Sequence, residues 1–174
     1  MIEPRSIYHA PDRWLTDSRV YNLIWLGRWL ERADAIARVL IASAELAMQK
    51  DDNIQTLRDI LSTTAAAWGI SIEDNSDVIQ ALLKDHPASS IYHSLYTARS
   101  NATHVGSIEL IQAISEMVSA LEKAVPTIDT PRAVQSLVQG VLGGLNNAYK
   151  IIDDSWFHRE ALSEEEVYHR FIQQ

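Results

Sequence analysis

One long amphipathic pattern constrains the fold of this chain more than any other feature of its sequence. Between residues 17 and 49, with no proline to interrupt them, apolar residues recur at alternating spacings of three and four: Leu23, Leu26, Leu30, Ala33, Ala37, Leu40 and Ala44. This spacing places the side chains on one face of an α-helix, and its heptad-like regularity is typical of helices that pack against other helices. Trp25, Trp29 and Ile36 widen the apolar face to nearly half the circumference. The pattern predicts a central bundle helix, about 45–50 Å long at 1.5 Å per residue.

Further helical segments follow, most of them bounded by capping residues, glycine or proline. We expect them at about residues 54–68, 78–83, 91–105, 108–121 and 131–152, with a last one after Ser163. The first of these segments begins after Asp51-Asp52-Asn53, Thr130 stands where an N-cap is needed, Gly69 can end a helix, and Ser163 with Glu166 forms a capping box. No segment shows the two-residue alternation of a strand. We therefore predict an all-α fold, a single-domain bundle of six or seven helices over residues 1–174.

Three glycines interrupt the segment that follows Pro131. Gly140, Gly143 and Gly144 lie inside an otherwise helical pattern, and each costs about 1 kcal/mol in helix propensity relative to alanine. We expect a close approach of a neighbouring helix to compensate for this cost.

Composition and charge exclude several classes of function. The 174 residues carry a formal charge of −8 and no cysteine. An acidic body repels phosphate backbones, so we expect neither nucleic acid nor an anionic membrane as a partner. Without cysteine, disulfides and thiolate catalysis are impossible. No uncharged apolar stretch reaches the roughly 18 residues of a membrane span, and residues 1–11 lack the apolar core of a secretory signal. The expected location is cytoplasmic.

Three motifs carry a family resemblance. The first is Trp25-Leu26-Gly27-Arg28-Trp29-Leu30-Glu31-Arg32-Ala33-Asp34 on the long helix. The second is Ser90-Ile91 followed by Ala98-Arg99-Ser100-Asn101-Ala102, and the third runs from Ser163 to Phe171. With these motifs the chain resembles the alpha-E family, a predicted helical domain named for its Glu-Arg motif, and it corresponds to about the first half of a usual member. It departs from the family at Thr103, His104 and Gly106, where basic residues are usual, and a second Glu-Arg motif is missing.

The resemblance implies a setting in peptide or amide-bond metabolism. Alpha-E domains are encoded with, or fused to, circularly permuted ATP-grasp ligases and transglutaminase-like proteins. No catalytic residue is established for the family, so the resemblance transfers none. The positions that match its motifs are candidate binding residues: Arg28, Glu31, Arg32, Asp34, Arg99 and Asn101.

The charged residues of the first motif allow two interpretations. Asp34 and Arg38 are spaced for an i,i+4 ion pair and Arg28 and Glu31 for an i,i+3 pair, which would make this an ordinary solvated or internally paired face. However, six of the eleven arginines and no lysine lie in residues 1–38. Arginine grips a carboxylate in two places where lysine cannot. This asymmetry favours a surface whose arginines bind carboxylates, either those of a partner or that of an internal acid such as Glu109 or Asp154.

Other constellations give weaker signals. Glu166 and His169 have the Glu-x-x-His spacing of di-iron bundles, but only one copy is present and Glu166 already has a capping role. The tryptophans flank the apolar seam and are expected in or beside the core. No glycine-rich phosphate loop is found. We predict no metal and no cofactor.

These observations lead to one functional hypothesis and two alternatives. We expect a helical interaction or accessory subunit that works with an ATP-grasp-type amide or peptide ligase, or with a transglutaminase-like protein, and that is not an enzyme on its own. The first alternative is an enzyme or enzyme half with a site around Arg28, Glu31 and Arg32. The second is a metal-carrying helical bundle.

An internal similarity suggests self-association. Residues 15–21, Leu-Thr-Asp-Ser-Arg-Val-Tyr, reappear as Leu-Ser-Glu-Glu-Glu-Val-Tyr at 162–168, as if a second copy of the first helix began there. Without such a helix to cover them, Leu23, Leu26, Leu30, Trp25 and Trp29 would form an exposed apolar stripe. We therefore predict a homodimer with the N-terminal helices near its axis. The competing view is that helices 54–68 and 134–152 cover the stripe within one subunit.

Overall fold

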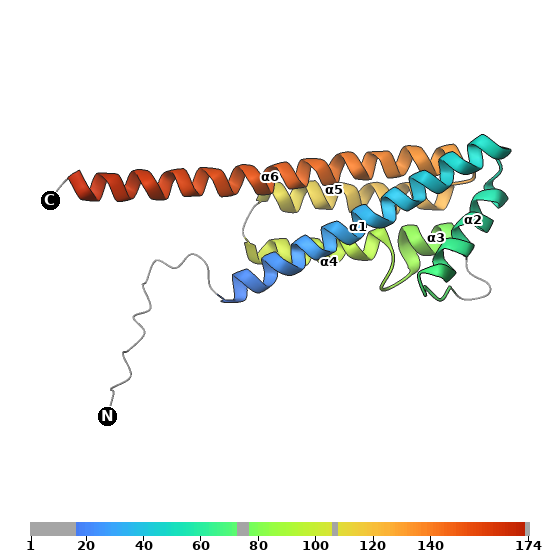
Figure 1. Cartoon of the computed structure of the whole chain (residues 1–174), viewed down its shortest axis with the longest axis horizontal. Coiled ribbons are helices and arrows are strands. Elements are labelled where there is room, and N and C mark those ends of the chain that lie inside the picture. The colour runs from blue at the N-terminus through green and yellow to red at the C-terminus, as the bar shows by residue number, and fades with distance from the viewer. Residues whose placement is uncertain (1–16, 73–76, 106–107, 173–174) are drawn as a thin grey trace, which may run out of the picture.

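The fold is entirely helical over the residues that the computed structural model describes, which are 17–72, 77–105 and 108–172 (Figure 1). The α-helices are α1 (Asp17–Lys50), α2 (Ile54–Ala67), α3 (Val78–Gln80), α4 (Ile91–Val105), α5 (Ile108–Ala124) and α6 (Pro131–Ile172). Two short elements of other helical types are η1 (Ala81–Asp85), a π-helix, and η2 (Val125–Thr127), a 3₁₀-helix. No strand occurs within these ranges, so the predicted fold class is confirmed.

The helix ends follow the capping residues that the sequence indicated. Asn53 accepts a hydrogen bond from the backbone N–H of Gln55 at 2.8 Å and so caps α2. Gly69, just beyond the end of α2, has a φ of +68°, a left-handed conformation that glycine adopts without strain. Thr130 Oγ1 accepts from the backbone N–H of Ala133 at 3.2 Å and opens α6 ahead of its first residue, Pro131.

Two boundaries differ from the prediction. The short helix after Asp77 widens into the π-helix η1 rather than ending as a regular α-helix. In addition, no helix begins at Ser163, because α6 continues through this residue to Ile172. The helix start predicted from the capping box is therefore wrong: residues 145–172 contain neither glycine nor proline, so nothing stops the preceding helix.

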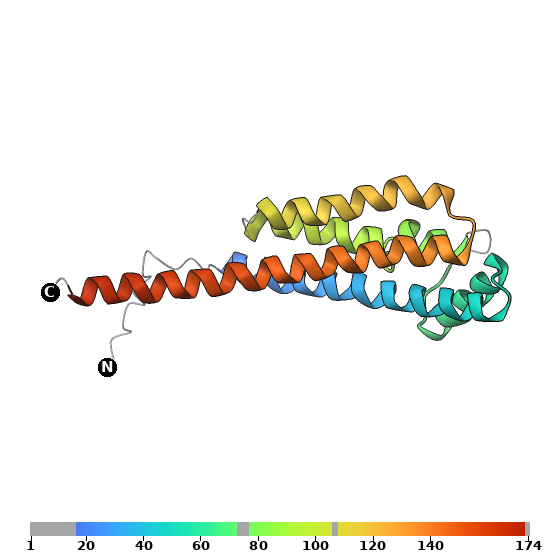
Figure 2. The same ribbon diagram turned by 90° about the horizontal axis from the view of Figure 1, so that it is seen from above.

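Four long helices form the body of the molecule. The helices α1, α4, α5 and α6 run in alternating directions, and each packs against two of the others, α1 against α4 and α6, and α5 against α4 and α6 (Figures 1 and 2). α2 and α3 lie at the end of the bundle where α1 finishes. The C-terminal part of α6 extends as a straight helix beyond the other three (Figure 2).

The apolar seam of α1 is the centre of the core. Leu26 is 1% exposed, and Leu30, Leu40 and Ala44 are completely buried. The covering helices are chiefly α4 and α6, whereas α2 contacts only the C-terminal end of α1. The competing view is therefore correct for residues 134–152, but α4 takes the place that we expected of residues 54–68. The buried leucines of the seam need no second chain to cover them.

Close packing against a neighbouring helix explains the presence of only one of the three glycines in α6. A methyl group added at Gly144 would lie 2.6 Å from Cγ and Sδ of Met117 on α5, so the two helices approach closely there. At Gly140 and Gly143 nothing lies within 4 Å of such a group. The expectation of close approach is confirmed at Gly144 and wrong at the other two.

None of the helices in the described ranges is long and apolar enough to cross a membrane.

Candidate functional site

A ladder of aromatic rings runs along one flank of α1. The ring centroids of Tyr21 and Trp25 are 6.1 Å apart, and those of Trp25 and Trp29 are 6.2 Å apart, because residues four apart on a helix lie one above the other. Tyr21 is 61% exposed, whereas the two tryptophans are half-buried beside the core. The flank therefore offers solvent a row of large apolar rings.

Two arginines lie over this ladder. The guanidinium carbon of Arg28 is 5.3 Å from the centre of the Trp25 ring, and that of Arg32 is 5.6 Å from Trp29. Each stacking contact is worth about 0.5–1 kcal/mol at an exposed site. Neither guanidinium makes an ion pair with any acid that the structure describes. Their N–H groups are therefore available to a carboxylate from outside the described chain.

The ladder continues onto α4. The rings of Trp29 and His93 meet edge to face with centroids 5.7 Å apart. Also on α4, the rings of Tyr92 and Tyr96 stack with centroids 6.2 Å apart, and the guanidinium carbon of Arg99 is 4.9 Å from the centre of the Tyr96 ring. The ammonium group of Lys84 is 5.6 Å from the centre of the Tyr92 ring.

The hydroxyl of Tyr92 ties this second aromatic pair to α5. It donates a hydrogen bond of 2.8 Å to Oε1 of Glu122. This bond is the main reason why the pKa of Tyr92 is raised above its ordinary value of 10.0. Tyr92 is therefore a neutral donor at physiological pH, and its ring is held in a fixed orientation.

The acidic residues of the first motif lie on the opposite flank of α1. Asp34 accepts two hydrogen bonds from Arg38, at 2.6 and 3.1 Å, which confirms the predicted i,i+4 pair. Tyr149 of α6 is close by: burial first, and then the carboxylates of Asp34 and Glu31, raise its pKa above 10.0. Glu31 and Arg32 therefore face different neighbours, since adjacent helical residues point about 100° apart.

The other predicted contacts are only partly found. Arg28 forms no ion pair with Glu31 in the described part of the chain, so that prediction is wrong, and its guanidinium lies over Trp25 instead. Asn101 uses its side-chain amide within its own helix, donating to the Thr97 carbonyl at 2.9 Å. The structure thus groups Arg28, Arg32 and Arg99 with aromatic rings, and separates Glu31, Asp34 and Asn101 from them.

Sequence reasoning missed His93, Tyr92, Tyr96 and Lys84 as members of this surface. A tyrosine pair at i,i+4 on α4 was a visible signal, since such residues are neighbours on a helix. The contact between His93 and Trp29 had no sequence signal, because it depends on how two helices far apart in the chain pack together.

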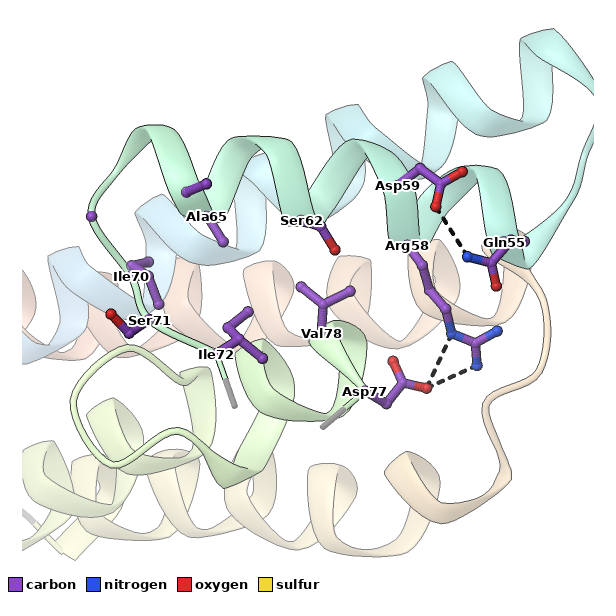
Figure 3. Close-up of a pocket in the computed structure, with 12 residues that line it drawn as sticks. Gln55, Arg58, Asp59, Ser62, Ala65, Ile70, Ser71, Ile72, Asp77 and Val78 are labelled. Carbon is purple, nitrogen blue, oxygen red and sulfur yellow. Dashed lines mark hydrogen bonds and ion pairs between the residues drawn. The ribbon is translucent and has the colours of Figure 1, made fainter. Parts of the chain in front are cut away.

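A groove of about 620 Å³ lies between α2 and residues 69–72 and 77–78 (Figure 3). Its charged and amide side chains bond in pairs: Arg58 donates to Oδ2 of Asp77 at 2.8 Å, and Gln55 donates to Asp59 at 3.0 Å. Asp77 also accepts from the backbone N–H of Ile79 and so caps α3. No sequence pattern indicated the Arg58–Asp77 pair, because it joins residues 19 apart. Because these groups satisfy one another, we interpret the groove as structural.

The electrostatics of Asp77 reflect these contacts. Burial alone would raise its pKa, but the hydrogen bonds from Arg58 and from the backbone N–H groups of Ile79 and Gln80 outweigh burial. The pKa of Asp77 is therefore below its ordinary value of 3.8.

No metal centre is evident where side chains are described. No group of three or more histidine, aspartate and glutamate side chains is arranged there to hold an ion. The side chains of Glu166 and His169, which carry the Glu-x-x-His spacing, lie outside the described residues.

Fold and surface together define a helical-bundle protein with an exposed flank of aromatic and arginine residues and no evident catalytic constellation in the described region. The model of the Alpha-E family, described as a predicted alpha-helical domain with a conserved ER motif, matches residues 18–163. The chain therefore belongs to the Alpha-E family, and Glu31-Arg32 stands within the matched range. Comparison with curated proteins and with solved structures gave no match.

Proposed function

We propose that this Alpha-E protein is a helical interaction subunit that works with an ATP-grasp-type amide or peptide ligase. One observation carries the proposal: Arg28 and Arg32 lie over Trp25 and Trp29 on an accessible flank, without acidic partners in the described chain. Tryptophan, tyrosine and arginine are the residues that most often dominate the binding energy of protein interfaces. An aromatic ring also holds the guanidinium in place, which lowers the entropy that binding would cost.

The geometry favours binding over catalysis. A catalytic site needs titratable groups that converge on one reacting atom. Here Glu31 lies on the side of Tyr149 while Arg32 lies over Trp29, so the two residues of the motif do not face one cavity. An enzyme half built on Arg28, Glu31 and Arg32 therefore has less support than an interaction subunit.

The identity of the partner is supported by the family alone. Alpha-E domains are encoded with, or fused to, circularly permuted ATP-grasp ligases and transglutaminase-like proteins. A ligase partner would present its own surface to the flank of α1, and the helical bundle would act as the rigid scaffold of that contact.

The test is to purify the protein from its source cell under native conditions and to identify the proteins that accompany it. We expect an ATP-grasp-type ligase, and we expect its ATP-dependent amide-bond formation to fall when this chain is removed. Loss of the ligase from the purified material when Arg28 and Arg32 are both changed to glutamine would link the association to the α1 flank. A ligase that is fully active and fully soluble without this chain would refute the proposal.

A further inference from the structure

The aromatic residues of α1 and α4 form two groups, which adjoin on α4 because His93 and Tyr96 are three residues apart and such residues are neighbours on a helix. Ile91, Leu95 and Ala98 are completely buried and define the inner face of α4. Tyr92, His93 and Tyr96 lie off this face: Tyr96 is 49% exposed, and Tyr92 and His93 are half-buried. His93 meets Trp29 on one side, and Tyr92 stacks on Tyr96 on the other. We call this surface the aromatic belt; its rings are Tyr21, Trp25, Trp29, His93, Tyr92 and Tyr96.

The aromatic belt is positively charged on an acidic protein. Its cations are Arg28, Arg32, Lys84 and Arg99, each lying over a ring of the belt. None of the four is paired with an acid in the region that the structure describes. The acid at its edge, Glu122, accepts a hydrogen bond from Tyr92. The whole chain carries −8, so a local excess of unpaired cations is the feature that a partner must complement.

We infer that the aromatic belt binds an acidic amphipathic helix of a partner protein. This inference rests on the proposed function and names the chemistry of the partner. Arg28 and Arg32 are four residues apart, and side chains with this spacing on a helix are about 5–6 Å apart. Two carboxylates one turn apart on the partner helix match this spacing. The apolar face of that helix lies against Trp25, Trp29 and Tyr96.

The net negative charge of the whole protein favours a protein ligand over a nucleic acid at the aromatic belt. Aromatic rings and arginines also bind single-stranded nucleic acid, by stacking and by phosphate contacts. A long polyanion, however, would extend beyond the belt and be repelled by the rest of a protein whose net charge is −8. A short acidic helix would contact the belt alone. The aromatic belt therefore favours a compact ligand with a few carboxylates.

The experiment uses the full chain and three probes. The first is a synthetic amphipathic peptide with glutamate and leucine one turn apart and no tryptophan, the second is the same peptide with glutamine for glutamate, and the third is oligo-dT. Binding is followed by the tryptophan fluorescence of the protein, since Trp25 and Trp29 lie in the belt. We expect the acidic peptide to bind at least about tenfold more tightly than the glutamine peptide, with an affinity that falls as salt is added.

Variants locate the binding site. The double variant Arg28→Gln/Arg32→Gln on α1 and the single variant Arg99→Gln on α4 should each weaken peptide binding severalfold. Arg132→Gln, at an exposed arginine of α6 outside the belt, is the matched control and should bind as the unchanged protein does. Circular dichroism confirms that each variant is folded. Equal binding of the two peptides, tighter binding of oligo-dT, or a normal affinity of Arg99→Gln would overturn the inference.

The outcomes separate this inference from the proposed function. If the ligase works unaided but the acidic peptide binds the belt, the proposed function fails and the inference stands. If the ligase needs this chain but the variants of Arg28, Arg32 and Arg99 support it fully, the function stands and the inference fails.

Discussion

Arg32 shows how much the role of one residue depends on what its side chain lies against. It is exposed and charged like Glu31 beside it, and on the sequence alone both read as one motif. In the structure the guanidinium of Arg32 lies over Trp29, whereas Glu31 is on the flank of Tyr149. A planar cation held on an indole ring differs from a solvated one, because its orientation is fixed before a ligand arrives.

The first prediction concerns this stacked arginine. Arg32→Lys keeps the charge and the helix propensity but loses the planar fork, so it should weaken binding of the acidic peptide on the order of threefold. The free energy of unfolding should change by less than about 1 kcal/mol, the size of an exposed cation–π contact. Glu31→Gln is the matched control on the other flank and should leave peptide binding unchanged. A loss of folding in Arg32→Lys, measured by urea denaturation, would show that the residue is structural.

Asp77 has two roles in the local structure, since it caps α3 and binds Arg58. Its pKa is below 3.8 in the folded protein, so the folded state binds this proton more weakly than the unfolded chain does. The stabilisation is therefore present above the unfolded pKa of about 3.9 and is lost as the pH falls through the folded value.

The second prediction follows from this linkage. Arg58→Gln should lower the free energy of unfolding at pH 7 by about 0.5–1 kcal/mol, a modest amount because the pair is partly exposed to solvent. The difference between variant and unchanged protein should shrink as the pH falls from 7 to 3, because Asp77 takes up its proton only below its ordinary pKa of 3.8. Urea denaturation at both pH values measures it, with Arg132→Gln as the control. An equal loss at pH 7 and pH 3 would contradict the role of the Asp77 charge.

At the scale of elements, the sequence predicted where helices begin better than where a helix continues or changes its type. Thr130 caps the helix that it was expected to cap, and α2 begins directly after Asn53 as predicted, because a helix start depends on residues next to it in the chain. Ser163 has the same local chemistry but lies inside α6, since a capping box cannot stop a helix that enters it with good helix formers. The π-helical turn of η1 had no local signal either.

The third prediction uses the glycines of α6. Gly143→Ala should raise the free energy of unfolding by up to about 1 kcal/mol, because alanine has the higher helix propensity and nothing lies within 4 Å of the added methyl group. Gly144→Ala should be less stable than Gly143→Ala, because its methyl group would lie 2.6 Å from the buried Met117. Thermal denaturation of both variants tests this. Equal gains at the two positions would mean that Met117 moves aside at no cost.

At the scale of the whole molecule, the sequence singled out candidate binding residues but did not indicate which of them lie together. The motifs singled out Arg28, Arg32 and Arg99, and all three lie over aromatic rings. Their placement on one surface depends on the packing of α1 against α4, which no local pattern encodes. The same packing buries Leu30, which the sequence had suggested as part of an uncovered stripe.

The last prediction concerns assembly, and the buried seam changes how it is tested. We retain the proposal of a homodimer with the N-terminal helices near its axis, but the contact must use exposed side chains. Ile24 is 52% exposed on α1, whereas Leu30 is completely buried. Ile24→Glu should therefore dissociate a dimer and leave the fold intact. Leu30→Glu should instead unfold the chain, because a buried unpaired carboxylate costs several kcal/mol.

Light scattering at micromolar concentration, together with circular dichroism, distinguishes these outcomes. The unchanged protein should have twice the chain mass of 19.6 kDa, and Ile24→Glu should have the mass of one chain with unchanged helicity. A mass of 19.6 kDa for the unchanged protein, constant as its concentration is raised, would rule out the dimer. A dimer that persists in Ile24→Glu would place the contact elsewhere than on the exposed face of α1, because a glutamate at the centre of an apolar contact would be left desolvated and unpaired.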